Sequence, residues 1–597
     1  MARTIPICKR FGAARVRAVL TAAALSLPLL SGCVDSASEN GADGLGRLAL
    51  ATPDPSPLGH YLSARLARDE MDSDRAASFY DIALAASPEN QPLLHQTMVL
   101  MLAEGRIQRA LELAENRIVH KDDAAMARLI LAVDAIRTGD LETARRHLDK
   151  ASGKNYMALL RPMLLAWVEA ASDQYGNAIK TLEQLRGRAA FEPFRSYHTA
   201  LISDFAGYED AAAAAYRETM KSEARRVTRV TLHYGGFLSR SGKRQQAMAL
   251  YGSFLKRLPT NPVIDQARDQ LLRGKNLWPP MTSVAHGVAE AFLSAGFAIA
   301  NARGGETARI YAHMALFLRP DLDSARMLLA EILENVERYE EAIGVYGQVP
   351  EASPFHWNAR IRTAANMNSL DRIDETVTLL RGMAKERPKD TSALITAARI
   401  LRSQERFKEA IAAYGNVLER LGTVEQRHWS LLYERGIALE RSKQWEAAEA
   451  DFLRALEFRP DEPSVLNYLG YSWIDQGVNL DRARKMIEKA VSKRPNDGYV
   501  VDSLGWAFFR LGKYAKAVEH LERAVELRPQ DPIINDHLGD AYWRAGRKLE
   551  ARFQWSHAID LGAEEKLLPI IHAKRKKGLA PAKPLQQENG GKSESSD

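Results

Sequence analysis

The stretch DSLGWAFFRLGKYAKAVEHLERAVELRP, residues 502–529, decides the fold. A second copy of the same pattern, NDHLGDAYWRAGRKLEARFQWSHAIDLG, follows at residues 535–562. In the first copy the apolar residues recur with helical spacing on either side of a Leu-Gly-Lys turn. Gly505 before the turn and Ala517 after it let two helices approach closely, and Pro529 ends the second helix. The stretch therefore predicts a pair of antiparallel helices.

The same pattern recurs along nearly the whole chain. An anchor residue follows each turn, usually 34 residues after the previous anchor, and a large apolar residue comes four positions later in most copies. Eight anchors are also followed twelve residues later by proline. The anchors are Ala76, Ala110, Ala144, Ala178, Ala212, Ala247, Ala308, Ala342, Thr376, Ala410, Ala448, Ala483, Ala517 and Ala551. The anchor, the large apolar residue and the proline recur with the same period, and this predicts an all-α repeat protein.

This pattern resembles the tetratricopeptide repeat (TPR), and the resemblance extends from residue 57 to about residue 562. It implies about 14 helix-turn-helix units stacked as a right-handed α-solenoid superhelix. The first helix of each unit (helix A) would line a concave groove that binds peptides or partner helices, and the second helix (helix B) would lie outside it. The repeats therefore indicate a binding surface.

The spacing of 61 residues between Ala247 and Ala308 interrupts the period. It predicts an N-terminal array at 57–259, an inserted helix and Pro-rich loop at 260–286, and a C-terminal array at 287–562. The insertion is either a simple helix-sized addition or a hinge or binding element. A capping helix is expected at 563–577 and a disordered tail at 578–597.

The N-terminus has the order of a secretory signal, basic and then apolar, over residues 1–32. It ends in Leu-Ser-Gly-Cys, which resembles the lipobox of bacterial lipoproteins and implies lipidation of Cys33. The alternative is a buried apolar cysteine in a plain signal or anchor helix. The other cysteine, Cys8, would be removed with the signal, and residues 33–56 would form a lipidated flexible tether. Val34 stands where inner-membrane retention needs Asp in enteric lipoproteins, so the resemblance favours the outer membrane, facing the periplasm.

Charge and motifs argue against nucleic-acid binding and against catalysis. The net charge of +7 falls to +2 without the predicted signal, which carries five basic and no acidic side chains. The basic run at 572–578 is interpreted as a solvated tail instead of a phosphate or lipid contact. No metal-ligand spacing, phosphate loop or complete nucleophile elbow occurs, so we expect no cofactor, no metal and no enzyme activity.

The candidate binding residues are a stripe on the A helices of the last units, left free by the positions that pack within each hairpin. Rings would supply buried contact area, and carboxylates would fix backbone or basic groups of a partner. The alternative for each ring is packing against the adjacent helix, and for each acid a solubilising or capping role. This stripe comprises Asn467, Tyr471, Asp502, Trp506, Phe509, Asp536, Asp540 and Trp543.

The lipobox, the long array and the amino-acid sequence of the last units together resemble those of long TPR lipoproteins of Gram-negative bacteria. The resemblance implies a membrane-anchored periplasmic scaffold or adaptor that binds cell-envelope proteins or peptides, such as a processing protease or envelope-assembly partners. The alternative is a scaffold for exopolysaccharide export or cell-wall binding. The sequence leaves the partner and the oligomeric state open.

Overall fold

The computed structural model describes residues 56–581, except 121–123, 154–156, 224–226, 259–260, 276–277, 279 and 301–304. Its described residues form 30 α-helices and no strand. The predicted signal, Cys33, the tether up to residue 55 and the tail from residue 582 lie outside the described residues.

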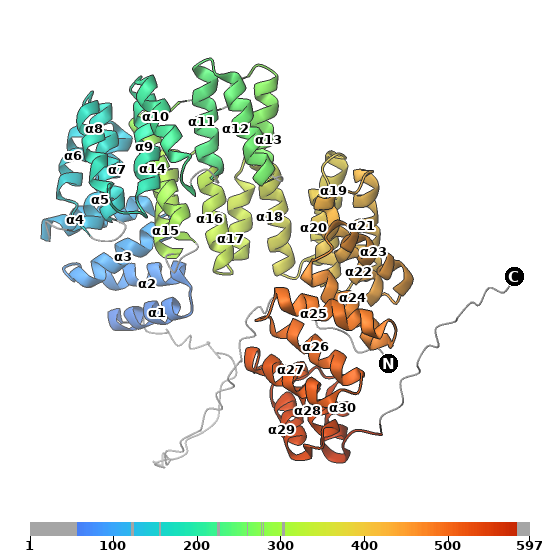
Figure 1. The fold of residues 1–597 in the computed structure, drawn as a ribbon. Coiled ribbons are helices and arrows are strands. Elements are labelled where there is room, and N and C mark those ends of the chain that lie inside the picture. Colours follow the sequence, from blue (N-terminus) through green and yellow to red (C-terminus); the bar gives the residue numbers. More distant parts are fainter. Residues whose placement is uncertain are drawn as a thin grey trace, which may run out of the picture. The chain divides into compact units, whose positions relative to one another are not determined.

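The first twelve helices form six hairpins, followed by one additional helix (Figure 1). Their bounds are α1 Pro57–Asp69, α2 Ser73–Ala85, α3 Gln91–Ala103, α4 Ile107–His120, α5 Ala125–Thr138, α6 Leu141–Lys150, α7 Met157–Ala171, α8 Tyr175–Leu182, α9 Glu192–Phe205, α10 Glu209–Thr219, α11 Thr228–Arg240, α12 Arg244–Arg257 and α13 Pro262–Leu272.

Eight further hairpins and a final helix complete the described chain. Their bounds are α14 Val284–Ala300, α15 Gly305–Leu318, α16 Asp323–Asn335, α17 Tyr339–Gly347, α18 His356–Ser369, α19 Ile373–Glu386, α20 Ser392–Ser403, α21 Phe407–Leu421, α22 Trp429–Arg441, α23 Trp445–Phe458, α24 Pro463–Gln476, α25 Leu480–Lys493, α26 Gly498–Arg510, α27 Tyr514–Leu527, α28 Pro532–Arg544, α29 Lys548–Asp560 and α30 Leu568–Lys577.

The anchors explain why these segments form hairpins. Each of the fourteen lies on the second helix of a hairpin, and each is 0% exposed. Facing them are small residues: a Cβ added to Gly505 would lie 2.5 Å from the Leu521 side chain, too close for any larger residue. Gly512 takes a φ of 73° at the turn, which favours glycine. The predicted all-α architecture of about 14 helix-turn-helix units is confirmed.

The described chain divides into two compact units, with the boundary between Leu379 and Leu380 inside α19. The segment 260–286, where the sequence suggested a change of array, lies within the N-terminal unit and contains α13. Helices α14 to α18 therefore belong to the N-terminal unit, in which α14 and α15 pack against the N-terminal hairpins.

Helix α14 fills the A-helix face of the N-terminal unit. It contacts α5, α7 and α9, and its hairpin partner α15 contacts α3 and α5 (Figure 1). Ten of its seventeen residues are buried. A Cβ on Gly287 would lie 2.2 Å from the Trp167 ring, so only glycine lets α14 approach α7 this closely. The chain's own helix is thus the occupant of this face.

A buried polar cluster fixes α14 in place. Glu290 of α14 pairs with Arg229 of α11 and accepts a hydrogen bond of 2.8 Å from the Tyr197 hydroxyl of α9. Tyr197 also contacts Nδ1 of His233. Because the tyrosine proton goes to the carboxylate, the ring nitrogen of His233 donates to the tyrosine oxygen. Burial lowers the pKa of Arg229 to about 10, so it stays charged at neutral pH.

A second polar contact ties α15 and the start of α17 to α3. Glu104, whose side chain is 5% exposed, lies 2.8 Å from Arg309 and 2.8 Å from Arg338. Burial alone would raise the pKa of Glu104, but the hydrogen bond from Arg338, the charge of Arg309 and the hydrogen bond from Ser73 outweigh it and lower it to about 2. Glu104 is therefore ionised over the whole physiological range.

Candidate partner-binding face

Polar contacts join successive A helices of the C-terminal unit. Arg399 of α20 pairs with Glu434 of α22 at 2.9 Å, and Tyr468 of α24 donates to Glu440 of α22 at 3.0 Å. Farther along, Arg510 of α26 lies 3.3 Å from Asp475 of α24. We call these contacts the rungs. They hold neighbouring A helices in register, and the stripe predicted to bind a partner lies on the same helices.

The three stripe aspartates are occupied by the chain itself. Asp502 is 2.9 Å from Nδ1 of His537 on the next A helix, and so forms a further rung. Asp536 and Asp540 both contact the ammonium group of Lys574 on α30. All three acids are less than a tenth exposed. A partner reaches these carboxylates only where it replaces His537 or Lys574.

The stripe aromatics form a packed column at α26. The Trp506 ring stacks on Phe509 at 4.7 Å and on His537 at 4.3 Å between ring centres. Trp506 and Tyr471 are buried, whereas Phe509 is half-buried. His537 is held by Asp502, so the column is fixed from both sides. Phe509 is the ring of this column that retains exposed surface.

Trp543, on α28, has its own set of neighbours. Lys548 and Arg552 of α29 lie over its ring, at 5.5 and 5.7 Å from the centre. The backbone after α30 lies against the ring too, since a Cβ on Gly578 would lie 1.8 Å from it. This end of the stripe is covered by α30 and the residues that follow it.

Asn467, on α24, has an unsatisfied amide oxygen. Its amide oxygen is buried, and none of the residues described by the structure donates a hydrogen bond to it. Leaving a buried acceptor unpaired costs about 1–3 kcal/mol.

The stripe therefore has two parts. Asn467 and Phe509, on α24 and α26, are half-buried side chains, while Asp536, Asp540 and Trp543, on α28, are engaged by α30 and its flanks. Helices α24, α26 and α28 contact in succession, so the parts are continuous.

Sequence reasoning missed His537 and Lys574, the residues that pair with the acids. Lys574 lies in the basic run interpreted as a solvated tail, yet it is 5% exposed. A signal was present, because Lys574 comes 34 residues after Asp540 and so falls at the same register position of a further helix A.

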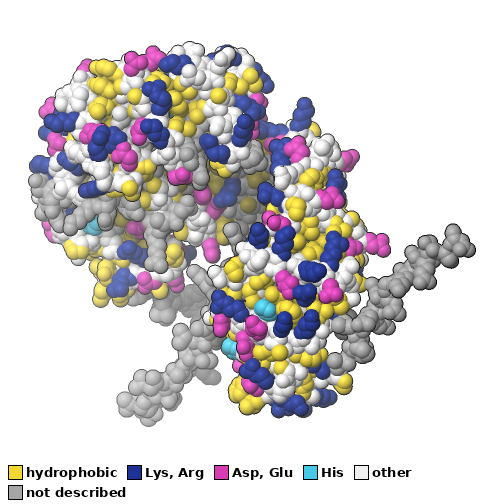
Figure 2. All heavy atoms as spheres, viewed as in Figure 1, with side chains coloured by type: hydrophobic (Ala, Val, Ile, Leu, Met, Phe, Trp, Pro, Cys, Tyr) yellow, Lys and Arg dark blue, Asp and Glu magenta, His cyan; other side chains and the backbone are white. Residues whose placement is uncertain are grey.

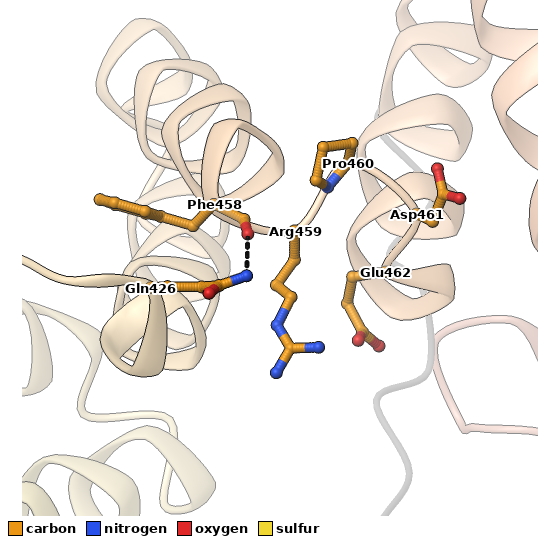
Figure 3. Close-up of a pocket in the computed structure, with 6 residues that line it drawn as sticks. All are labelled: Gln426, Phe458, Arg459, Pro460, Asp461 and Glu462. Carbon is orange, nitrogen blue, oxygen red and sulfur yellow. Dashed lines mark hydrogen bonds between the residues drawn. The ribbon is translucent and has the colours of Figure 1, made fainter.

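The hollows of the surface lie elsewhere. One, of about 340 Å³, is lined by Gln426, Phe458, Arg459, Pro460, Asp461 and Glu462, where the turn between α23 and α24 meets a short 3-10 helix (Figure 3). Gln426 donates to the Phe458 carbonyl at 3.1 Å, and Figure 3 shows Arg459 and Glu462 side by side. Four of the six lining residues are polar or charged, whereas small-molecule sites are typically lined mostly by apolar side chains.

The described residues contain no group of three or more His, Cys, Asp or Glu side chains placed to hold a metal ion. Among these same residues, no helix is long and apolar enough to cross a bilayer. Figure 2 shows Lys and Arg interspersed with Asp and Glu over the visible surface of the C-terminal unit.

Comparison with known proteins locates the repeat signature in the C-terminal unit. Residues 395–463 match the family described as Tetratricopeptide repeat, and residues 505–546 match the family described as TPR repeat. Neither match indicates a catalytic family. These segments are TPR units.

Two curated relatives align with part of the chain. A TPR repeat-containing protein of Pseudomonas aeruginosa, PA4667, is 27% identical over 201 residues, 34% of this chain and 33% of the relative. The BBSome complex member BBS4 of Bos taurus is 28% identical over 149 residues, 25% of this chain and 28% of the relative. The alignments thus span about a third of the length of these relatives or less. Among solved structures, yeast Tom70 covers 87% of this chain and 95% of its own, at 13% identity and a TM-score of 0.31.

Proposed function

We propose that the protein is a membrane-anchored scaffold that binds a protein or peptide along the A helices of its C-terminal unit. The observation that carries this proposal is the open part of the stripe, where the half-buried side chains of Asn467 and Phe509 occupy neighbouring helices. A ring supplies contact area, and an amide side chain forms hydrogen bonds with a peptide backbone. TPR units, which this unit contains, are protein-binding scaffolds.

The A-helix face of the N-terminal unit is already covered, which supports placing the binding face on the C-terminal unit. Its A-helix face already holds α14 and α15, through apolar packing and the ion pairs of Glu290 and Glu104. Displacing α14 would expose ten buried residues, a cost that few partners could offset. In this proposal the N-terminal unit serves as a rigid body and the C-terminal unit as the binding arm.

A site-specific crosslinker tests the binding face. A photoreactive phenylalanine analogue replaces Phe509 in the full chain, and a matched control replaces Lys485, which is exposed on the B helix α25. We expect a partner crosslinked from position 509 and not from position 485. The substitution Asn467→Ala should reduce the yield from position 509 several-fold. Equal yields from the two positions would contradict the proposed face.

The anchor is a second part of the proposal. Lipidation of Cys33, supported by its place in Leu-Ser-Gly-Cys, would hold the chain at the outer membrane, facing the periplasm. We expect Cys33→Ser to abolish incorporation of a palmitate analogue and to release the chain from the membrane fraction. Cys8→Ser is the matched control and should change neither result. Persistent labelling of the Cys33→Ser chain would contradict the anchor.

The partner proposed is a cell-envelope protein, such as a processing protease or an envelope-assembly component. This choice rests on the likeness to TPR lipoproteins, and identification of the crosslinked partner tests it. Saturable binding of purified cell-wall glycan or exopolysaccharide without a protein partner would favour the alternative scaffold. Turnover of a substrate by the purified chain alone would contradict the assignment as a non-enzyme.

A further inference from the structure

Helix α30 lies beside α29 at the end of the C-terminal unit (Figure 1). The Lys574 ammonium is 2.8 Å from a carboxylate oxygen of Asp536 and 2.8 Å from one of Asp540. Trp555 holds Asp540 from the other side, donating from Nε1 at 3.0 Å. One lysine therefore balances two buried carboxylates, both of them stripe residues.

Few residues of α30 are buried against the rest of the unit. Of its ten residues, Ile571 and Lys574 are buried. Leu567, at its N-cap position, makes no side-chain capping hydrogen bond. A helix of this length is marginal in water without tertiary contacts. The position of α30 thus depends on Ile571 and Lys574, together with Leu567 and Leu568, which are partly buried against the core.

The residues after α30 extend the cover. Gly578 lies against the Trp543 ring, and Arg544 at the end of α28 donates to the carbonyl of Ala580. This contact places an extended segment of the chain over the half-buried ring at the end of the stripe. Residues 568–581 therefore occupy α28 much as a bound peptide would.

The two carboxylates require a cation. Buried charges without a partner are strongly destabilising, so Asp536 and Asp540 favour any occupant that brings an ammonium group to this position. Lys574 supplies it from within the chain. A lysine on another polypeptide has the same chemistry.

We propose that α30 is an exchangeable occupant of the stripe, and that a lysine-bearing segment of a partner protein replaces it on α28. The inference rests on the proposed function, because it names a feature of that partner and a regulation of the same face. While α30 is docked, the partner reaches only α24 and α26. Once α30 is displaced, the whole stripe is available.

A peptide probe tests the exchange without knowledge of the partner. The probe is a fluorescein-labelled peptide of residues 563–581, titrated into the full chain and followed by anisotropy. We expect the Lys574→Ala chain to bind it at least tenfold tighter than the wild-type chain does, since the mutated α30 competes poorly. The matched control, Lys576→Ala, changes an exposed lysine of the same helix and should bind like wild type. A probe peptide in which Lys574 is replaced by alanine should bind at least tenfold more weakly than the unmodified probe.

Several results would overturn the proposal. One is equal binding by wild-type and Lys574→Ala chains whose α26 and α28 amides remain protected from hydrogen exchange. Another, which needs no variant, is exchange of the α30 amides in the wild-type chain as slowly as those of α28. If the molecular mass of the full chain doubled as its concentration rose, and the probe peptide reversed this, the site would be assigned to α30 of a second copy. Failed crosslinking from position 509 with successful probe binding would contradict the proposed function alone.

Discussion

Helices α14 and α30 both lie against A helices of their own unit, but different forces hold them. α14 has seventeen residues, ten of them buried, and it approaches α7 at a glycine. α30 has ten residues, of which Ile571 and Lys574 are buried. Burial of apolar surface stabilises by about 25 cal/mol per Å². The buried apolar side chains of α14 therefore hold it in place. α30 is held by the ion pairs of Lys574 and by fewer apolar side chains.

The difference shows how one repeat surface serves two purposes. A buried ion pair adds little net stability compared with apolar packing, because desolvation offsets the attraction, but it is selective for the charged partner. The face covered by α14 is therefore a permanent interior. The face covered by α30 is selective and only weakly closed.

The largest expected effect comes from breaking the polar cluster under α14. Glu290→Ala leaves Arg229 buried without its carboxylate, which should cost the N-terminal unit about 3–5 kcal/mol of unfolding free energy. Urea unfolding, with hydrogen exchange in α7 and α9, measures it. Glu340→Ala, whose side chain is 65% exposed in the same unit, is the control and should change stability by less than about 0.5 kcal/mol. A loss below about 1 kcal/mol for Glu290→Ala would show that apolar packing alone holds α14.

A slightly smaller effect is expected from acid. The pKa of Glu104 is about 2 in the folded chain and 4.5 ordinarily. Its stabilisation is fully present above about pH 4.5 and is lost as the pH falls toward 2, and amounts to about 3 kcal/mol. We expect Glu104→Gln to remove this part of the pH dependence of the N-terminal unit in urea unfolding at pH 7, 4.5 and 3. An unchanged slope would show that other carboxylates dominate acid unfolding.

The smallest effect should be local to α30. In Gly578→Ala the new methyl group would overlap the Trp543 ring, at a φ of 75° that also favours glycine. We expect the free energy needed to undock α30 to fall by about 1–2 kcal/mol, which would be seen as 5- to 30-fold faster amide exchange in α30. The midpoint of thermal unfolding should stay within about 2 °C. The control Gly415→Ala, with no atom near the added Cβ, should leave α30 unchanged. A matching loss of protection in α28 would mean that α30 is part of the core.

Local patterns in the sequence account for the hairpins. The anchor alanines, the glycines opposite them and the turn at Gly512 act over a few residues, so the period predicts them. The occupant of the N-terminal face could not be predicted this way. Glu290 meets Tyr197 across 93 residues, and helical spacing carries no information on contacts at that distance.

The candidate site was partly predictable for the same reason. The register placed the eight stripe residues on successive A helices, as the helix bounds bear out. It did not reveal that His537 and Lys574 pair with the acids, because pairing depends on which side chains meet between helices. Whether the stripe binds a partner stays a prediction.

The contact between Glu104 and Arg309 also has a consequence for synthesis. These residues are 205 positions apart in the chain. At roughly 5–20 residues per second, the ribosome adds Arg309 about 10–40 s after Glu104. Hairpins that form before α14 and α15 are added have their A-helix face uncovered and Glu104 without its arginines. The N-terminal unit therefore completes its interior only when these later helices pack.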